Sequence, residues 1–175
     1  MAPSRQSKSE LEPTRVREIG EAALRVFARS GVEGATMQAI ADEAGLAKGT
    51  LYLYFDSRLD LVDRLAQEAF AELKTATALA LGGHGAPLAR LESAVRAHVE
   101  FFERRRDLFR LFLAVAHPGP GPERSARISR SCNPLYGSYL DLLAAFLAEG
   151  QARGELAPFP PERMARFVAE GLAGL

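Results

Sequence analysis

The segment 36–58 constrains the fold of this chain most, because two short apolar stripes lie on either side of one glycine. Thr36 precedes the first stripe, and its hydroxyl can accept a free backbone N–H of a first helical turn. Gly45 can adopt the left-handed conformation that ends a helix. Leu51 and Phe55 then lie four residues apart, on one face of a second helix. The spacing predicts a helix-turn-helix, an arrangement whose second helix enters the major groove of DNA.

The side chains that point outward from the second helix suit a nucleic-acid interface. Lys48 and Thr50 can donate to phosphates or base edges, and Leu53 can contact a thymine methyl group. Gly49 allows a close approach of the backbone. Two exposed helices of an ordinary all-α protein would have the same spacing, so the spacing alone leaves both interpretations open.

The segment AIADEAGLAKGTLYLYFDSR resembles the DNA-binding signature of the TetR family of transcriptional regulators. The resemblance is strong over about residues 15–65, and beyond them it concerns only the helical layout. The residues that match the family pattern in register are Ile40, Ala41, Ala44, Gly45, Leu46, Gly49, Thr50, Leu51, Tyr52 and Phe55.

Two residues depart from the family pattern. Ala47 stands where the family often has Ser or a similar cap, and losing such a cap costs roughly 1 kcal/mol. Arg58 replaces the usual Lys, but it keeps the charge and can bind a phosphate through two N–H groups. We therefore expect a loosely started second helix and a preserved phosphate contact.

The resemblance implies a set of DNA contacts. Thr36, Tyr52 and Arg58 are expected to hold phosphates, whereas Gln38 and several residues of the second helix face base edges. The full set of expected DNA-binding residues is Thr36, Gln38, Lys48, Gly49, Thr50, Tyr52, Leu53, Tyr54 and Arg58.

Apolar residues recur at helical spacing throughout the chain, and nowhere do β-branched residues alternate as in a strand. The sequence predicts an all-α fold of about nine helices, in which Pro134 interrupts or kinks one helix. The pattern of the last helix continues to Leu175, which suggests a short or clipped helix. The expected organisation is a disordered arm at 1–13, a three-helix DNA-binding domain at 14–60, and an effector-binding and dimerisation domain at 61–175.

The charge of the chain is balanced, which is unusual for a nucleic-acid binder. Residues 1–60 contain eight Lys and Arg against nine Asp and Glu. We expect the acidic residues to lie away from the DNA, and the salt dependence of binding to be shallow, because each neutralised phosphate contributes a slope of about −0.9. The acidic residues concerned are Glu18, Glu21, Asp42 and Glu43.

The sequence shows no signal for a membrane or for secretion. It has no apolar run of about 18 residues and no apolar core near its N-terminus. Its one cysteine, Cys132, cannot form an internal disulfide, so we expect a cytoplasmic protein.

Metal and catalytic chemistry are not expected. His84, His98 and His117 form no His-x3-His pair, and no phosphate loop, Gly-x-Ser-x-Gly elbow or catalytic carboxylate pair occurs. We expect no metal, no cofactor and no enzymatic activity. The alternatives left open are a ligand-independent DNA-binding protein with the same helix-turn-helix, and a helical small-molecule-binding protein or enzyme.

The resemblance also implies three partners: a double-stranded DNA operator, a second copy of the chain, and a small effector. The effector is expected to be hydrophobic, since the candidate pocket is mostly apolar and aromatic. Candidate pocket residues are His98, Phe101, Phe102, Phe109, Phe112, Leu113, Tyr136 and Tyr139. Candidate dimer contacts are Tyr139, Leu143, Phe146, Phe167 and Leu172.

Overall fold

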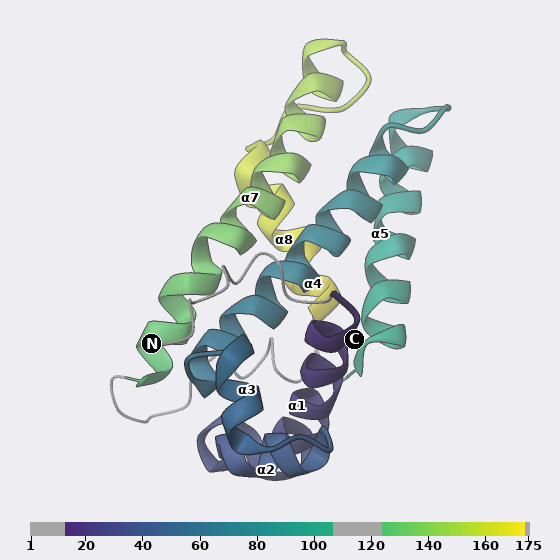
Figure 1. Ribbon diagram of the computed structural model, residues 1–175. Helices are drawn as coiled ribbons and strands as arrows, with labels where there is room; N and C mark the ends of the chain where they lie inside the picture. Colours follow the sequence, from purple (N-terminus) through teal and green to yellow (C-terminus); the bar gives the residue numbers. More distant parts are fainter. Residues whose placement is uncertain (1–12, 107–123, 174–175) are drawn as a thin grey trace, which may run out of the picture.

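The computed structural model describes residues 13–106 and 124–173, and within these ranges all regular secondary structure is helical (Figure 1). The all-α prediction is confirmed. The helices are α1 (Pro13–Gly34), α2 (Met37–Glu43), α3 (Lys48–Tyr54), α4 (Arg58–Leu81), α5 (Pro87–Arg104), α7 (Arg124–Ala152) and α8 (Pro161–Ala173). We call α1–α3 the head and α5, α7 and α8 the body.

The described residues form seven helices, whereas the sequence predicts about nine for the whole chain. The difference arises partly at Pro134, which lies inside α7 and does not end it. A proline removes one backbone hydrogen bond of the helix, but side chains that follow it, such as Tyr139 and Leu143, are buried and hold the helix in place.

Helix α1 contains a kink at Gly31, whose backbone dihedral angles are not helical. Gly31 has a φ of 68°, the left-handed conformation that favours glycine. A further helical segment follows as far as Gly34. Gly31 therefore bends α1 without ending it.

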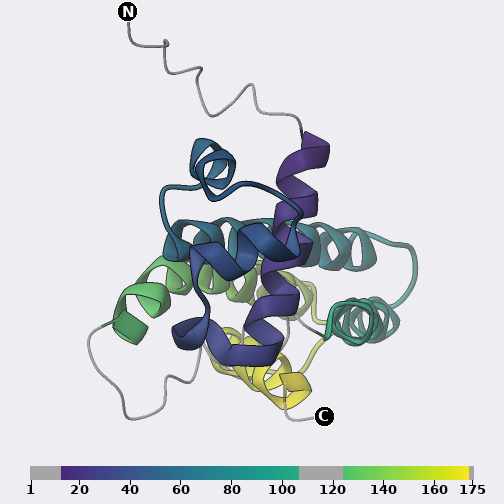
Figure 2. The same ribbon diagram turned by 60° about the horizontal axis from the view of Figure 1, so that its bottom comes forward.

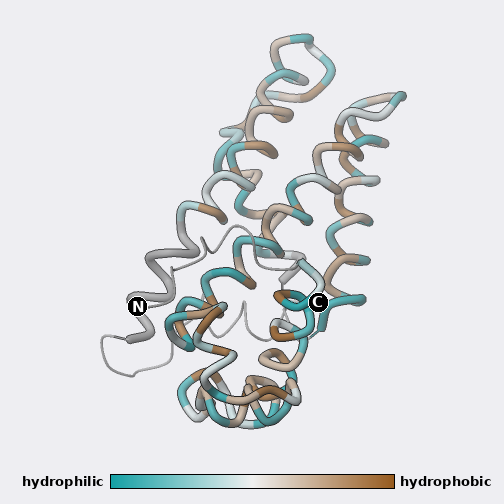
Figure 3. The backbone as a smooth tube through the Cα atoms, viewed as in Figure 1, coloured by the Kyte–Doolittle hydropathy of each residue, from teal (hydrophilic) through white to brown (hydrophobic). Residues whose placement is uncertain are grey.

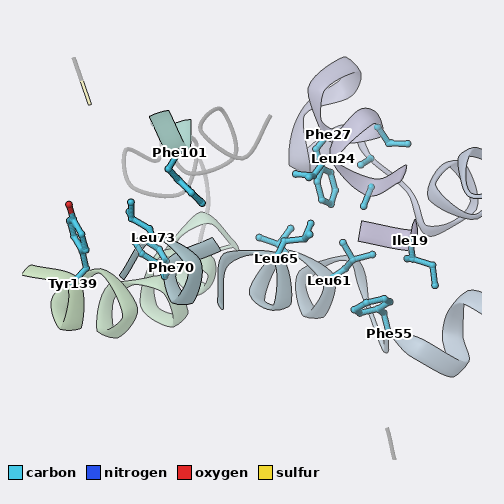
Figure 4. Packing of buried hydrophobic residues seen from close by; sticks show 14 of the residues in the cluster. Ile19, Leu24, Phe27, Phe55, Leu61, Leu65, Phe70, Leu73, Phe101 and Tyr139 are labelled. Carbon is cyan, nitrogen blue, oxygen red and sulfur yellow. The ribbon is translucent and has the colours of Figure 1, made fainter. Parts of the chain in front are cut away.

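Helix α4 connects the head to the body. Figure 4 shows Leu61 and Leu65 of α4 near the side chains of α1, and Leu73 near Phe101 and Tyr139 of the body. One continuous cluster of buried apolar residues includes all of these side chains. Helix α4 buries apolar side chains against the head near its start and against the body further along. The head and the body therefore share one core.

The body helices pack around α4. Helices α5 and α7 both pack against α4, and α8 packs against α7 (Figure 1). Seen from the head end, α1–α3 lie in front of these helices (Figure 2). At the far end, Arg90 of α5 donates to the carbonyl oxygen of Leu81 at 2.6 Å, and its guanidinium lies 4.9 Å from the ring centroid of Phe146. Arg90 therefore joins the ends of α4, α5 and α7.

The apolar residues of the described helices alternate with hydrophilic ones around each helix, as Figure 3 shows by colour. This is the pattern of amphipathic helices that bury one side. None of the described helices combines the length and the hydrophobicity needed to cross a membrane.

Candidate nucleic-acid interface and effector site

The start of α2 and the turn that follows it are fixed by two local features that the sequence predicts. Thr36 Oγ1 accepts a hydrogen bond from the backbone N–H of Ala39 at 3.1 Å, so Thr36 is the N-cap of α2. Gly45 has a φ of 66° and permits the left-handed turn after α2. The position of α3 relative to α2 therefore follows from local sequence.

Helix α3 is held by its inward face. Leu51 is completely buried and Phe55, directly after the helix, is 5% exposed. Ala47 precedes α3 and makes no side-chain capping hydrogen bond, as the sequence predicts. Since the cap is missing, the orientation of α3 depends on the packing of Leu51 and Phe55.

The outward face of α3 is open to solvent and carries the side chains expected to meet DNA. Lys48 and Gly49 are exposed, and the exposed fractions of Tyr52 and Leu53 are 45% and 67%. Thr50 and Tyr54 are half-buried. A short helix that presents a lysine, hydroxyls and an exposed leucine can reach both phosphates and base edges in a major groove.

Several acidic residues of the head accept hydrogen bonds from neighbouring side chains. Arg25 Nε donates to Glu43 Oε1 at 2.6 Å, and Arg29 donates to the other oxygen of Glu43. These hydrogen bonds, from Arg25 first and Arg29 second, lower the pKa of the Glu43 carboxyl. Gln38 Nε2 donates to Asp42 Oδ1 at 2.7 Å. Glu43 thus joins α1 to α2, and Gln38 uses one of its two amide N–H groups to bind Asp42.

Arg58 is bound inside the head. Its Nη1 donates to the carbonyl oxygens of Glu33 at 2.8 Å and Ala35 at 2.7 Å. The side chain is 18% exposed. The guanidinium therefore anchors the connection between α1 and α2, a role that the sequence analysis did not identify.

The body contains one buried polar pair. His98 of α5 and Tyr139 of α7 are 5% and 2% exposed, and His98 Nδ1 lies 2.7 Å from the Tyr139 hydroxyl oxygen. Burial lowers the pKa of His98 to about 4 and raises the pKa of Tyr139. Both side chains are therefore neutral at pH 7.

Two buried polar atoms, one within this pair and one next to it, lack hydrogen-bond partners within the described part of the chain. They are His98 Nε2 and Thr77 Oγ1, and Thr77 of α4 is completely buried. The ring of Phe102 lies 5.0 Å from the imidazole, and the ring of Phe101 lies 5.0 Å from that of Phe102. The centre of the body is thus aromatic and holds incompletely bonded polar groups.

Comparison with known proteins identifies the head. Residues 19–65, which include the capped α2, the glycine turn and α3, match the family described as "Bacterial regulatory proteins, tetR family". The head is therefore that of the TetR family of helix-turn-helix transcriptional regulators.

Similarity to individual TetR proteins extends into the body. The chain is 24% identical over 154 residues to the fatty acid metabolism regulator protein of Bacillus subtilis, covering 88% of this chain and 77% of that protein. It is 28% identical over 154 residues to the transcriptional repressor BepR of Brucella suis, covering 87% and 73%. The fold resembles that of FadR from Bacillus subtilis in complex with stearoyl-CoA, with a TM-score of 0.74, 22% identity, and coverage of 90% and 85%.

The structure brings part of the expected TetR-type pocket together. His98, Phe101 and Phe102 of α5 lie near Tyr139 of α7, and Tyr136 contacts Phe70 of α4, with ring centroids 6.3 Å apart. Phe109, Phe112 and Leu113 lie outside the described residues. Sequence analysis missed Thr77, although its place between Leu73 and Leu81 on the buried stripe of α4 was an available signal.

The expected dimer contacts fall into two groups. Tyr139, Leu143 and Phe146 are 2%, 2% and 8% exposed within one subunit. They therefore have little surface left for a partner, because their apolar faces already pack against the body. Phe167 of α8 is 73% exposed and is available to a partner. The side chain of Leu172 is not among those that the structure describes.

Proposed function

We propose that this TetR-family protein is a repressor that binds a near-palindromic operator as a homodimer and releases it when a small hydrophobic ligand enters the body. The main support for the proposal is the orientation of α3 in the head. Its inward residues are buried, whereas Lys48, Tyr52 and Leu53 are exposed. A helix held in this way can enter a major groove without rearrangement of the head.

The dimer is proposed from the surface of α8. Phe167 is a large apolar side chain that is 73% exposed on a helix packed against α7. A two-fold axis near this residue would pair α7 and α8 with their copies. The two recognition helices would then read half-sites that are separated by about one turn of DNA or a multiple of it.

The hydrophobic effector is proposed from the lining of the body. Phe101, Phe102 and Tyr139 surround the partly bonded His98, which gives an apolar environment with one polar group to orient a ligand. The structural relative with stearoyl-CoA binds a ligand that has a long apolar chain. A role as repressor agrees with the name of the Brucella relative.

Helix α4 is the proposed path from ligand to operator. Its Thr77 lies beside Tyr139 of the polar pair, and its Arg58 holds the connection before α2. At Gly20 of α1, an added Cβ would lie 3.0 Å from Leu65 Cδ2, so α1 and α4 are in close contact. A displacement of α4 would therefore move the head. The ligand can drive this displacement only if it binds the released form more tightly than the DNA-bound form.

The test is selection of duplexes from random DNA by the purified full chain at physiological salt, followed by addition of methyl decanoate as an acyl probe. The proposal predicts enrichment of a palindrome, retention of binding without the probe, and at least a tenfold loss of operator affinity with it. The matched control is Lys74→Ala, a substitution on α4 away from α3. No enrichment would overturn the proposal, and enrichment without release would leave a ligand-independent DNA-binding protein.

A further inference from the structure

Gln38 and Asp42 form a hydrogen-bonded pair on the surface of α2. Gln38 Nε2 donates to Asp42 Oδ1 at 2.7 Å, and both side chains are exposed. The two residues are four positions apart, so their side chains lie on the same face of the helix. Because an ionised carboxylate can only accept hydrogen bonds, Asp42 binds the N–H end of the Gln38 amide and not its oxygen. The pair therefore gives the amide a defined orientation.

The pair lies on the side of α2 that the rest of the head leaves uncovered. Glu43 faces α1, where Arg25 and Arg29 donate to its carboxylate. Successive residues of a helix are about 100° apart around its axis, so Gln38 and Asp42 lie about 100–140° away from Glu43. A further side of α2 packs into the core through its buried residues, which are Met37, Ile40 and Ala41.

The hydrogen bond to Asp42 leaves Gln38 with the groups that recognise one particular base. A side-chain amide has one carbonyl oxygen and two N–H groups, so a carbonyl oxygen and one N–H remain. In the major groove, adenine presents an acceptor at N7 beside a donor at N6, and a glutamine amide can bind both. Guanine presents two acceptors there, so it cannot satisfy the carbonyl oxygen. The oriented amide thus matches adenine.

We propose that Gln38 reads an adenine in each operator half-site and that Asp42 is its positioning residue, which holds the amide in the orientation that adenine requires. This inference rests on the proposed function, in which the head binds a major groove. It adds the base that α2 recognises. It also assigns a role to an acidic residue that the charge pattern alone would place away from the DNA.

The charge of Asp42 and its hydrogen bond to Gln38 have separable effects on DNA binding. A carboxylate near DNA repels the phosphates, so its removal should strengthen binding to all sequences. Asp42→Asn removes the charge but keeps a carbonyl oxygen that can accept from Gln38 Nε2. This variant should keep the preference for adenine. Asp42→Ala removes the charge and the acceptor together, so it should lose part of that preference.

The experiment is selection of duplexes from random DNA by the full chain, followed by titration of the enriched palindrome with each adenine of the half-site replaced in turn. At one position, wild type should prefer adenine about tenfold, which lies within the range for a bidentate contact. Gln38→Ala should abolish this preference. Asp42→Ala should reduce it by about threefold, and Asp42→Asn should leave it within about twofold of wild type.

The matched control is Glu92→Ala. Arg96 Nη2 donates to Glu92 Oε1 at 3.0 Å, in an exposed pair of the same spacing on α5 in the body. Removal of this pair should leave every base preference unchanged. Thermal unfolding of all variants separates positioning from stability, because a merely structural Asp42 would lower the affinity for all sequences equally and leave the preference for adenine intact. That result would overturn the positioning role.

The remaining outcomes distinguish the inference from the proposed function. A palindrome whose base preferences survive Gln38→Ala would overturn the inference and leave the proposed function intact. A preference for cytosine that Asp42→Ala removes and Gln38→Ala keeps would mean that Asp42 itself accepts from the cytosine amino group, which also overturns the inference. If wild type enriches no sequence, the proposed function fails and the inference fails with it.

Discussion

Arg58 Nη1 donates to the carbonyl oxygen of Ala35 at 2.7 Å, which ties the first residue of α4 to the residue immediately before the N-cap of α2. The same nitrogen donates to the carbonyl oxygen of Glu33 at 2.8 Å. Helix α4 and the helix-turn-helix are thus joined by hydrogen bonds from a charged donor, which are stronger than those between neutral groups. We expect Arg58 to be a positioning residue for the head, in addition to any phosphate contact.

Replacing Arg58 should weaken the head. Arg58→Met keeps much of the apolar stem but leaves the two carbonyl groups without this donor, so the free energy of unfolding should fall by about 2 kcal/mol. Operator affinity should also fall, because α2 loses the anchor in front of its N-cap. Urea denaturation and DNA titration measure the two effects.

The matched control for Arg58 is Arg64→Met. Arg64 Nε donates to Glu68 Oε1 at 2.7 Å on the surface of the same helix, and both side chains are about half exposed. Such a pair contributes less than about 1 kcal/mol. Equal destabilisation by the two substitutions would show that the contacts of Arg58 with the α1–α2 connection have no special role.

Two residues of α3 should affect DNA binding differently. Tyr52→Phe removes a hydroxyl that is expected to hold a phosphate, so affinity for all sequences should fall by a similar factor. Lys48→Ala removes a donor that is expected to face base edges, so preference should relax at particular base pairs, by about 1–3 kcal/mol each. Selection of bound duplexes with each variant measures both patterns, and the reversed pattern would show that the roles are exchanged.

Much of the head could be predicted from sequence, because its signals are local. Thr36 is the N-cap of α2 and Gly45 has a positive φ. Both features depend only on residues within a few positions of the chain. The contacts of Arg58 could not be predicted, because they join residues 23 and 25 positions apart. The sequence around a charged side chain does not indicate whether that side chain binds DNA or a backbone carbonyl group.

The packing of the body was less predictable, because an apolar stripe does not indicate which helix it packs against. Tyr139, Leu143 and Phe146 were assigned to a partner, but their side chains are buried inside the subunit. Leu88 of α5 is apolar, yet it is 71% exposed. Helical spacing identifies the buried face of a helix only approximately. Which residues at the edge of that face are buried depends on tertiary packing.

Phe167 should be needed for dimer formation. Phe167→Glu places a charge on the exposed apolar surface of α8 and should weaken self-association at least tenfold, as measured by sedimentation equilibrium. Leu79→Glu is the matched control, because Leu79 is equally exposed, at 73%, near the end of α4. Loss of the dimer with Leu79→Glu and not with Phe167→Glu would place the interface on another surface.

Glu43 should make the head sensitive to acid. Its two arginine partners lower the pKa of the carboxyl below the usual 4.5, so the folded state holds the proton less tightly than the unfolded state. The stabilisation is therefore present above pH 4.5 and is lost as the pH falls through the lowered pKa. Thermal unfolding of Glu43→Gln should show a lower midpoint than wild type at pH 7 and a smaller difference at pH 3. A difference that is constant with pH would contradict the ion-pair explanation.

His98 should give the body a separate dependence on pH. Burial lowers the pKa of His98 from 6.5 to about 4, so the unfolded state binds a proton at pH values where the folded state does not. The stability contributed by the neutral imidazole is complete above pH 6.5 and is lost as the pH falls toward 4, by roughly 3 kcal/mol in all. Among the groups that face the imidazole, the Tyr139 phenol stays protonated throughout this range because burial raises its pKa.

Urea denaturation between pH 7 and pH 4 measures this loss. His98→Gln cannot titrate, so its stability should fall less steeply than that of wild type over the same range. His84→Gln is the matched control for the removal of a histidine, since His84 is exposed in the break between α4 and α5. A wild-type slope in His98→Gln would mean that other groups govern the acid sensitivity of the body. In that case the imidazole would not be held neutral against protonation by its burial beside Tyr139.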